Sequence, residues 1–191
     1  MRRAIIVCLG LILSYSSICY AGRYFLAPGG SDLNNGRTSQ AAWGTLQHAD
    51  DVLVAGDTLY VRGGAYTNTQ YFSSTVSGTS GHPIVIMAYP GERPVFTGLL
   101  NGGSGRFEIS NSYLDIIGIA SIDGHSSQTG CRIVVLSGAS HVNFRNCLFE
   151  GYRAAKLEQT CGFYENVRID GGSNYITMDA CTVQYQGEGC V

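Results

Sequence analysis

The chain has 191 residues, enough for one domain of ordinary size. Charged residues make up only 14% of it and nearly balance, at a formal net charge of −2. This argues against a nucleic-acid-binding protein, because such proteins usually carry a basic patch. With 26 glycines and few lysines or glutamates, the composition disfavours long amphipathic helices and favours many short strands joined by glycine-rich turns.

The first residues have the layout of a secretory signal peptide. A basic start precedes the ten-residue apolar run Ala4–Leu13, which is too short to span a bilayer. Small residues at Cys19 and Ala21 provide a cleavage site after Ala21. We therefore expect residues 1–21 to be removed and residues 22–191 to form a secreted or periplasmic protein without membrane contact. The alternative is a short membrane anchor, which the length of the apolar run disfavours.

The first predicted elements of the mature chain are a strand, a loop and a helix. Arg23–Pro28 has the pattern of a strand, and Gly29–Gly36 is rich in turn-forming residues. A helix is predicted over Thr45–Ala55, with Thr45 as its N-cap and Gly56 as its stop. One face of this helix is apolar, and consists of Leu46, Ala49 and Leu53.

Short strands make up the rest of the chain. We expect strands at Thr58–Arg62, followed by a turn at Gly63–Gly64, and at Pro83–Tyr89 and Pro94–Thr97. Three more strands come at regular intervals further along, and they are Phe107–Ser110, Arg132–Val135 and Val167–Asp170.

A seven-residue pattern recurs three times in the second half of the chain. The copies 113–119, 141–147 and 175–181 align without a gap and start 28 and 34 residues apart. Each has apolar residues at its second, fourth and seventh places, which indicates a strand with one buried face, a tight corner and a second strand. The interval suits one coil of a solenoid. The sequence therefore predicts an all-β protein, a parallel β-helix with three strands per coil, capped at its N-terminal end by the short helix.

The repeat also predicts which side chains stack in the core. Leu114, Val142 and Ile176 should form one buried column, and Ile116, Phe144 and Met178 should form the next. The last coil is cut short at residues 186–191 without a polar cap, although terminal coils normally need one. We therefore expect the β-helix domain 22–191 to be a fragment, incomplete at its C-terminal end.

The first half of the chain carries a recognisable set of motifs. These are Tyr24-Phe-Leu-Ala-Pro-Gly-Gly-Ser-Asp32, Trp43-Gly-Thr-Leu-Gln47, Gly56-Asp-Thr-Leu-Tyr-Val-Arg-Gly-Gly-Ala-Tyr66 and Ala88-Tyr-Pro-Gly-Glu92. Together they closely resemble the start of secreted right-handed parallel β-helix proteins of the pectate-lyase-like superfamily. The resemblance extends from Tyr24 to about Tyr185 and is specific for the fold, whereas the same N-terminal cap precedes lyases, hydrolases, epimerases and proteins of no known activity.

The resemblance implies extracellular polysaccharide chemistry on an acidic polymer. Pectate lyases of this type use calcium held by clustered aspartates, and a lysine or arginine base that removes the proton at C5 of a uronate. No such cluster is found in this sequence, so catalytic residues are not assigned and the catalytic coils are expected to be missing. Calcium is implied by the resemblance alone, and the residues themselves indicate no cofactor and no metal site.

Four charged side chains are the candidate substrate-binding residues. Phe107 and Ile109 should face the core, so Glu108 should face outward, and the same reasoning places Arg132, Arg168 and Asp170 outward. Glu108, Arg132 and Arg168 should then stack in one row, which suits an acidic sugar. The resemblance to β-helix lyases places the sugar cleft along this same face. The alternative is a solvated charge ladder with salt bridges between coils.

The cysteines form two series. Cys147 and Cys181 occupy the same inward place in successive coils, and Cys131, Cys161 and Cys190 recur 30 and 29 residues apart. Stacked coils lie about 4.8 Å apart, within disulfide reach. We expect disulfides or buried thiols rather than a metal site, because Cys-x-x-Cys pairs are absent. In particular, Cys161 should lie within bonding reach of Cys131 or Cys190.

Two smaller motifs have structural readings. Asp32, Asn34, Asn35 and Gly36 loosely resemble a calcium loop, but they are also common turn formers, and a turn is favoured. Asn146, at a tight corner, resembles the asparagines that many β-helices stack into ladders.

The leading functional hypothesis is a secreted polysaccharide-active β-helix protein, lyase-like on acidic uronate polysaccharide and monomeric. The first alternative is a non-catalytic β-helix that binds carbohydrate or serves as a surface scaffold. The second is a glycoside hydrolase on the same fold, which needs two or three aspartates at hydrolytic spacing, and no aspartate pair occupies neighbouring coil positions here.

Overall fold

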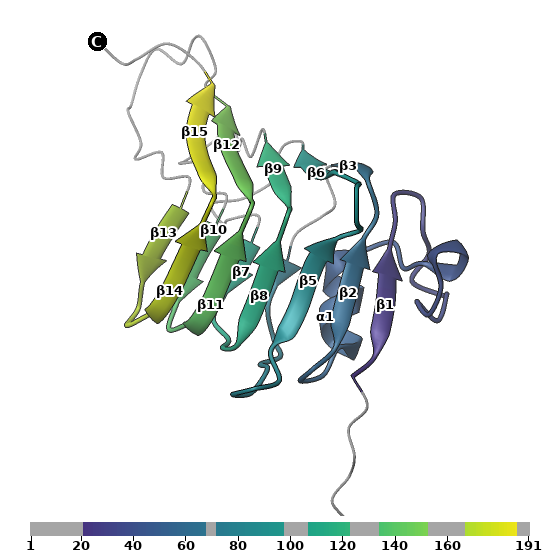
Figure 1. The fold of residues 1–191 in the computed structure, drawn as a ribbon, viewed down its shortest axis with the longest axis horizontal. Coiled ribbons are helices and arrows are strands. Elements are labelled where there is room, and N and C mark those ends of the chain that lie inside the picture. Colours follow the sequence, from purple (N-terminus) through teal and green to yellow (C-terminus); the bar gives the residue numbers. More distant parts are fainter. Residues whose placement is uncertain (1–20, 68–71, 98–106, 123–133, 153–166, 187–191) are drawn as a thin grey trace, which may run out of the picture.

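The chain winds through three sheets of parallel strands, with one strand of each sheet per coil (Figure 1). This is seen in a computed structural model that describes residues 21–67, 72–97, 107–122, 134–152 and 167–186. The strand order of every sheet follows the chain, so each coil stacks on the one before it. The predicted parallel β-helix with three strands per coil is confirmed.

Sheet A lies at the front of Figure 1 and is the longest of the three. Its strands, in order, are β1 (Arg23–Leu26), β2 (Thr58–Val61), β5 (Ile84–Ala88), β8 (Leu114–Ile117), β11 (Ser140–Arg145) and β14 (Asn174–Asp179). Sheet B contains β3 (Gly64–Thr67), β6 (Pro94–Thr97), β9 (Ala120–Ile122), β12 (Leu148–Tyr152) and β15 (Thr182–Gln186). Sheet C contains β4 (Phe72–Ser73), β7 (Phe107–Ile109), β10 (Val134–Ser137) and β13 (Val167–Asp170).

The predicted core columns are confirmed by the strand register. Val142 pairs with Leu114 on one side and with Ile176 on the other, and Phe144 pairs with Ile116 and Met178 in the same way. The inward side chains of β8 and β11 are buried because each is covered by the coils above and below, whereas Ile176 and Met178 of β14 are only partly buried. Cys147 is buried among them, and Cys181 packs against the same core, as expected of two inward cysteines.

Tight corners on both sides of sheet A place residues in the left-handed backbone region. At the start of the strands, φ is 59° at Tyr113, which precedes β8, and 56° at His141 and 52° at Tyr175, the second residues of β11 and β14. After the strands, φ is 71° at Gly118, 52° at Asn146 and 50° at Ala180. Glycine and asparagine adopt this region readily, whereas alanine and the aromatic residues do so only when their surroundings hold them there. No asparagine ladder forms at these described corners, because the stacked neighbours of Asn146 are a glycine and an alanine.

A short helix covers the N-terminal end of the core, as predicted. The helix α1 spans Leu46–Val52, and Thr45 caps it by accepting a hydrogen bond from the backbone N–H of His48. Its inward side chains Leu46, Ala49 and Leu53 are 1–3% exposed. The helix ends at Val52 rather than Ala55, because Leu53 is extended and the Asp57 carboxylate accepts from the N–H of Val54, which turns the chain toward β2.

Polar contacts fasten this helix to the first strand of sheet C. Gln47 exchanges hydrogen bonds with the backbone of Ser73, and the Asp50 carboxylate accepts from both the N–H and the hydroxyl of Thr75, at 2.7 and 2.6 Å. Asp50 is only 3% exposed, and this burial raises the pKa of its carboxyl. The helix therefore takes the place that a further strand of sheet C would occupy.

Most predicted strand bounds agree with the structure to within one or two residues, and the largest shift concerns β10. It begins at Val134 rather than Arg132, so its first residue lies two positions later than predicted. The strand β3 starts at Gly64, where only a turn was expected. Within the described ranges, no helix is long and apolar enough to cross a bilayer.

Candidate functional site

The outer face of sheet C carries the predicted site. Phe107 and Ile109 are 2% and 1% exposed, so the Glu108 side chain between them lies on the outer face, as expected. In register with Glu108 are Ser73 on one side and Val135 on the other, and Val135 in turn pairs with Arg168.

This register corrects one part of the predicted row. The position between Glu108 and Arg168 holds Val135 and not Arg132, so the register of β10 differs from the predicted one by three residues. Arg132 itself lies outside the described residues, so its role in binding stays a prediction. The pattern failed here because residues 133–136 are all apolar, which leaves the alternation of the strand undefined.

Arg168 and Asp170 do meet on the outer face. They lie two residues apart on β13, so both side chains project to the same side. The guanidinium Nε of Arg168 donates to Asp170 Oδ2 at 2.6 Å, and the two side chains remain 39% and 37% exposed. This ion pair is formed within one strand. It presents a fixed guanidinium at the surface, which is a group suited to carboxylate recognition.

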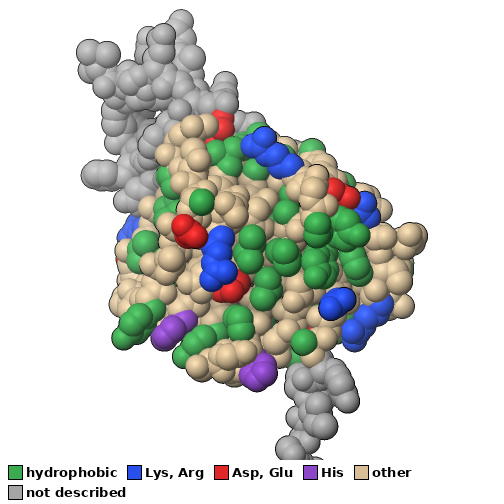
Figure 2. All heavy atoms as spheres, in the orientation of Figure 1, with side chains coloured by type: hydrophobic (Ala, Val, Ile, Leu, Met, Phe, Trp, Pro, Cys, Tyr) green, Lys and Arg blue, Asp and Glu red, His purple; other side chains and the backbone are tan. Residues whose placement is uncertain are grey.

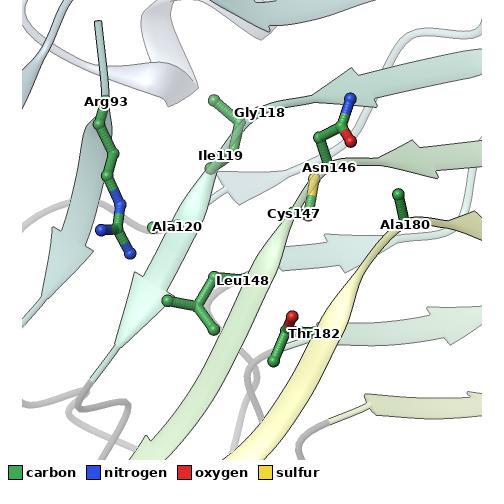
Figure 3. Close-up of a pocket in the computed structure, with 9 residues that line it drawn as sticks. All are labelled: Arg93, Gly118, Ile119, Ala120, Asn146, Cys147, Leu148, Ala180 and Thr182. Atoms are coloured by element: carbon green, nitrogen blue, oxygen red, sulfur yellow. The ribbon is translucent and has the colours of Figure 1, made fainter.

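A separate pocket of about 360 Å³ lies at the corner between sheets A and B (Figure 3). The Arg93 side chain, from the residue just before β6, reaches toward Ala120 and Leu148, while Asn146 is turned away from it. The remaining lining comes from the corner residues Gly118, Ile119, Cys147, Ala180 and Thr182. Such a pocket, with one cation above an apolar floor, can accept a small group but contains no acid–base pair.

An aromatic stack that was not predicted from the sequence lies at the other corner of sheet A. The rings of Tyr113 and His141 lie 4.5 Å apart, those of His141 and Tyr175 lie 4.6 Å apart, and both pairs are nearly parallel. His141 Nδ1 is also 2.6 Å from the Ser140 hydroxyl. The signal was present in the sequence, because each of these residues occupies the first place of the seven-residue repeat. The stack offsets the cost of a positive φ at three residues that carry large side chains.

The loop around Asp32 is a structural turn in its observed contacts. The carboxylate accepts hydrogen bonds from the N–H groups of Gly44 and Thr45 and from the Thr45 hydroxyl, at 2.7–2.9 Å. Burial opposes ionisation of Asp32, but the bonds from Thr45 and Gly44 outweigh it and hold its pKa below the usual value. Among the described residues, no three acidic, histidine or cysteine side chains gather closely enough to hold a metal ion, so these residues do not fit a calcium site.

Two predictions fall on parts of the chain that the structure does not describe. Residues 1–20 of the expected signal peptide lie outside the described ranges. So do Cys131, Cys161 and Cys190, and the disulfide expected among them stays a prediction. In the described part, Cys147 and Cys181 are both free thiols.

Comparison with known proteins identifies relatives of this architecture. The sequence profile of the family described as "Pel9A-like, right handed beta helix region" matches residues 24–187. Pectate lyase PEL9 of Emericella nidulans is 41% identical over 78 residues, which cover 41% of this chain but only 19% of that protein.

Solved structures share the fold at low sequence identity. Pectate lyase Pel9A superposes with a TM-score of 0.62 and 22% identity, over 83% of this chain and 38% of that one. A rhamnogalacturonan lyase superposes with a TM-score of 0.61 and 17% identity, over 88% of this chain and 63% of that one. The chain therefore spans a minor part of its pectate-lyase relatives, and likenesses at this identity establish the right-handed β-helix fold alone.

Proposed function

The chain belongs to the Pel9A-like right-handed β-helix family, and we propose that it is a secreted, lyase-like protein that binds acidic, uronate-containing polysaccharide on the outer face of sheet C. The observation that carries this proposal is the family match over residues 24–187, which spans all three sheets. The relative named as a pectate lyase supports an acidic substrate. Because this chain covers 19% of that relative, its activity and substrate belong to the proposal.

The proposed binding residues are the charged groups of sheet C. Arg168 is oriented by Asp170 at 2.6 Å, and Glu108 lies on the same face two coils away. A guanidinium has five N–H donors in a planar fork and can hold two carboxylates at once. A uronate carboxylate is a group that such a fork recognises. Arg132 completes the proposed set on the strength of the sequence alone.

The described coils are proposed to bind the polymer, and no catalytic residue is assigned to them. Proton removal at C5 of a uronate needs a base close to that carbon, and in lyases that this chain resembles it is assisted by calcium. The described residues do not fit a calcium site. Whether product forms is therefore a separate measurement from whether polymer binds.

Calorimetric titration with polygalacturonate tests the binding face. Arg168→Ala should weaken binding about ten- to hundredfold, because a charged hydrogen-bonded contact contributes about 1.5–3 kcal/mol. Arg145→Ala is the matched control, since Arg145 is an exposed arginine at the end of β11 on sheet A. Added salt should weaken wild-type binding, while the thermal midpoint of Arg168→Ala should stay close to that of the wild type.

Two outcomes would contradict this proposal. If folded wild-type protein binds no acidic polysaccharide, the charged groups of sheet C are only a surface ladder. If Arg145→Ala weakens binding as much as Arg168→Ala, the attraction comes from overall charge and not from this face. An ultraviolet assay for unsaturated products, run with and without calcium, then separates a lyase from a carbohydrate-binding scaffold.

A further inference from the structure

The outer face of sheet A carries an unusual row of apolar side chains. Strand register places Phe25, Tyr60, Met87 and Ile117 side by side on β1, β2, β5 and β8. Each directly follows a buried residue of its own strand and is itself partly exposed, so all four project outward. The next two positions of the same row, on β11 and β14, are Arg145 and Asp179. The apolar character is therefore confined to the N-terminal strands.

A third aromatic ring joins this row. Tyr89 directly follows β5, and its ring centroid lies 6.3 Å from that of Phe25 and 6.0 Å from that of Tyr60, whose own rings are 5.7 Å apart. We call Phe25, Tyr60, Met87, Tyr89 and Ile117 the aromatic surface. Figure 2 shows hydrophobic side chains gathered over the N-terminal half of sheet A, with charged groups around them. Apolar side chains that are grouped on a surface and surrounded by polar groups are typical of a binding site, whereas single exposed apolar residues are common on any protein.

The rim of the aromatic surface is rigid and nearly neutral. The Arg62 guanidinium lies 4.8 Å from the centroid of the Tyr89 ring, and it donates to both oxygens of Glu92, at 2.7–3.0 Å. These bonds from Arg62, together with one from the Gly63 N–H, lower the pKa of Glu92 to about 2, so the pair stays ionised and mutually neutralised at ordinary pH. Arg62 therefore adds no unbalanced positive charge to the aromatic surface beside Tyr89.

Hydrogen-bonding groups flank the same surface. The second outward row of sheet A contains Thr58, Val85, Asp115 and Asn143 in neighbouring register positions. Asn143 donates to Asp115 at 2.7 Å, which fixes both side chains beside Ile117. Aromatic faces next to fixed amide, carboxylate and hydroxyl groups match a sugar chain, whose pyranose rings have apolar C–H faces and hydroxyl edges.

We propose that the aromatic surface binds a neutral polysaccharide that presents flat pyranose faces, separately from the acidic polymer assigned to sheet C. We assign it a neutral chain because the Arg62 and Glu92 charges beside Tyr89 are paired with each other. It is a polymer because the surface extends across four adjacent strands, each about 4.8 Å from the next. Such a surface would hold the protein on a cell-wall material while another face meets its acidic component.

Depletion of the protein by microcrystalline cellulose tests the proposal. Tyr89→Ala and Tyr60→Ala should each weaken the partition coefficient about five- to tenfold, because each removes one stacking ring. Tyr89→Phe, which keeps the ring, should bind as the wild type does. Tyr175→Ala is the matched control, because Tyr175 is 72% exposed and lies on the aromatic stack outside this surface.

Salt separates this site from the one on sheet C. Binding to cellulose should be insensitive to added sodium chloride, whereas the proposed binding to polygalacturonate should weaken. Circular dichroism and thermal midpoints establish whether each variant is folded. If Tyr60→Ala does not fold, Tyr89→Ala still tests the proposal, because Tyr89 lies beyond the end of β5.

Three results would overturn the proposal. The first is a folded wild-type protein that is not depleted by cellulose. The second is a loss of binding in Tyr175→Ala as large as in Tyr89→Ala. The third is dimerisation of the wild type in analytical ultracentrifugation that Tyr89→Ala abolishes, because the surface would then be occupied by a second copy of this chain. Failure of polygalacturonate binding, in contrast, bears only on sheet C.

Discussion

The coil that begins with β8 and the coil that begins with β14 carry the same residue pattern, yet they are buried very differently. Leu114 and Ile116 are each 1% exposed, whereas their counterparts Ile176 and Met178 are only partly buried. Around β14, Ile169 and Val183 are 50% and 48% exposed. The difference teaches that burial in this fold is supplied by the neighbouring coils and not by the coil's own sequence.

The two ends of the described solenoid show the same contrast. At the N-terminal end, α1 lies across the core, and its inward residues are almost fully buried. Beyond β13, β14 and β15, the described residues place no element, and inward side chains there meet solvent. Equal hydrophobic substitutions should therefore have unequal costs along the chain, and this can be measured.

The largest expected effect is on Phe144. Phe144→Ala should lower the free energy of unfolding by about 3–5 kcal/mol, because a ring that is 1% exposed and packs edge-on against Phe149 leaves a cavity. Met178→Ala, in the same column one coil later, should cost less than half as much, because Met178 already borders solvent. Urea denaturation of both variants gives the comparison. Equal losses would mean that the last described coil is covered as completely as the middle one.

The second effect concerns the capped end. Asp50→Ala should cost about 1–3 kcal/mol, since the N–H and hydroxyl of Thr75 lose the carboxylate that accepts from both. Asp51→Ala is the control, because Asp51 is the next residue of α1 and is exposed. Its effect should stay within about 0.5 kcal/mol. Similar values for the two variants in chemical denaturation would show that the helix does not hold the N-terminal end closed.

A smaller, pH-dependent effect distinguishes the corners between sheets A and B. In the N-terminal coils, this corner is tied by Arg62 and Glu92, whereas the later corners at Gly118, Asn146 and Ala180 are tight turns. Arg62, followed by the Gly63 N–H, lowers the pKa of Glu92 to about 2 from an ordinary value of 4.5. Because the folded-state pKa is the lower one, this stabilisation is present above pH 4.5 and is lost as pH falls toward 2.

Thermal melts over this pH range test the assignment. Glu92→Gln should lower the thermal midpoint at pH 7, and its difference from the wild type should shrink between pH 4.5 and pH 2. Asp179→Asn removes a carboxylate from an exposed position at the end of β14 and should leave the wild-type pH profile unchanged. A constant difference between wild type and Glu92→Gln at all pH values would show that the ion pair does not stabilise the corner.

The fold was predicted well from the sequence because the seven-residue pattern, which corresponds to one coil, occurs three times. The places that it did not predict have physical reasons. The register of β10 was misplaced by three residues because a run of four apolar residues fits both faces of a strand. The turn expected at Gly63–Gly64 is in fact the start of β3, since glycine marks a bend equally well in a turn and at the entry of a strand.

Surface features were harder to predict than the core. Phe25 and Tyr60 belong to strands that were predicted. The same aromatic residue types occur on the inward and outward faces of a strand, so residue type alone does not show that these two side chains form an outward row, and the register does. Arg168 and Asp170 were placed on one face correctly, because a separation of two residues fixes this in any strand. Their contact, unlike their direction, depends on rotamers that no sequence pattern records.

The smallest expected effect concerns the reactivity of two cysteines at equivalent positions. Their alkylation rates compare the burial of the coil that contains β11 with that of the coil that contains β14. Cys147 is 3% exposed, and its thiol lies 3.4 Å from the backbone carbonyls of Ile116 and Arg145. Burial raises its pKa to about 11. At pH 8, the Cys147 thiol is then ionised in only about a thousandth of the molecules, and the thiolate is the reactive form.

Cys181 occupies the equivalent position one coil later but is partly exposed. Iodoacetamide should therefore alkylate Cys181 at least tenfold faster than Cys147 in the native protein, as followed by mass spectrometry of the two peptides, and at equal rates in urea. Equal rates in the native protein would mean that the two coils are covered alike, and the last described coil would then be no more exposed than the middle one.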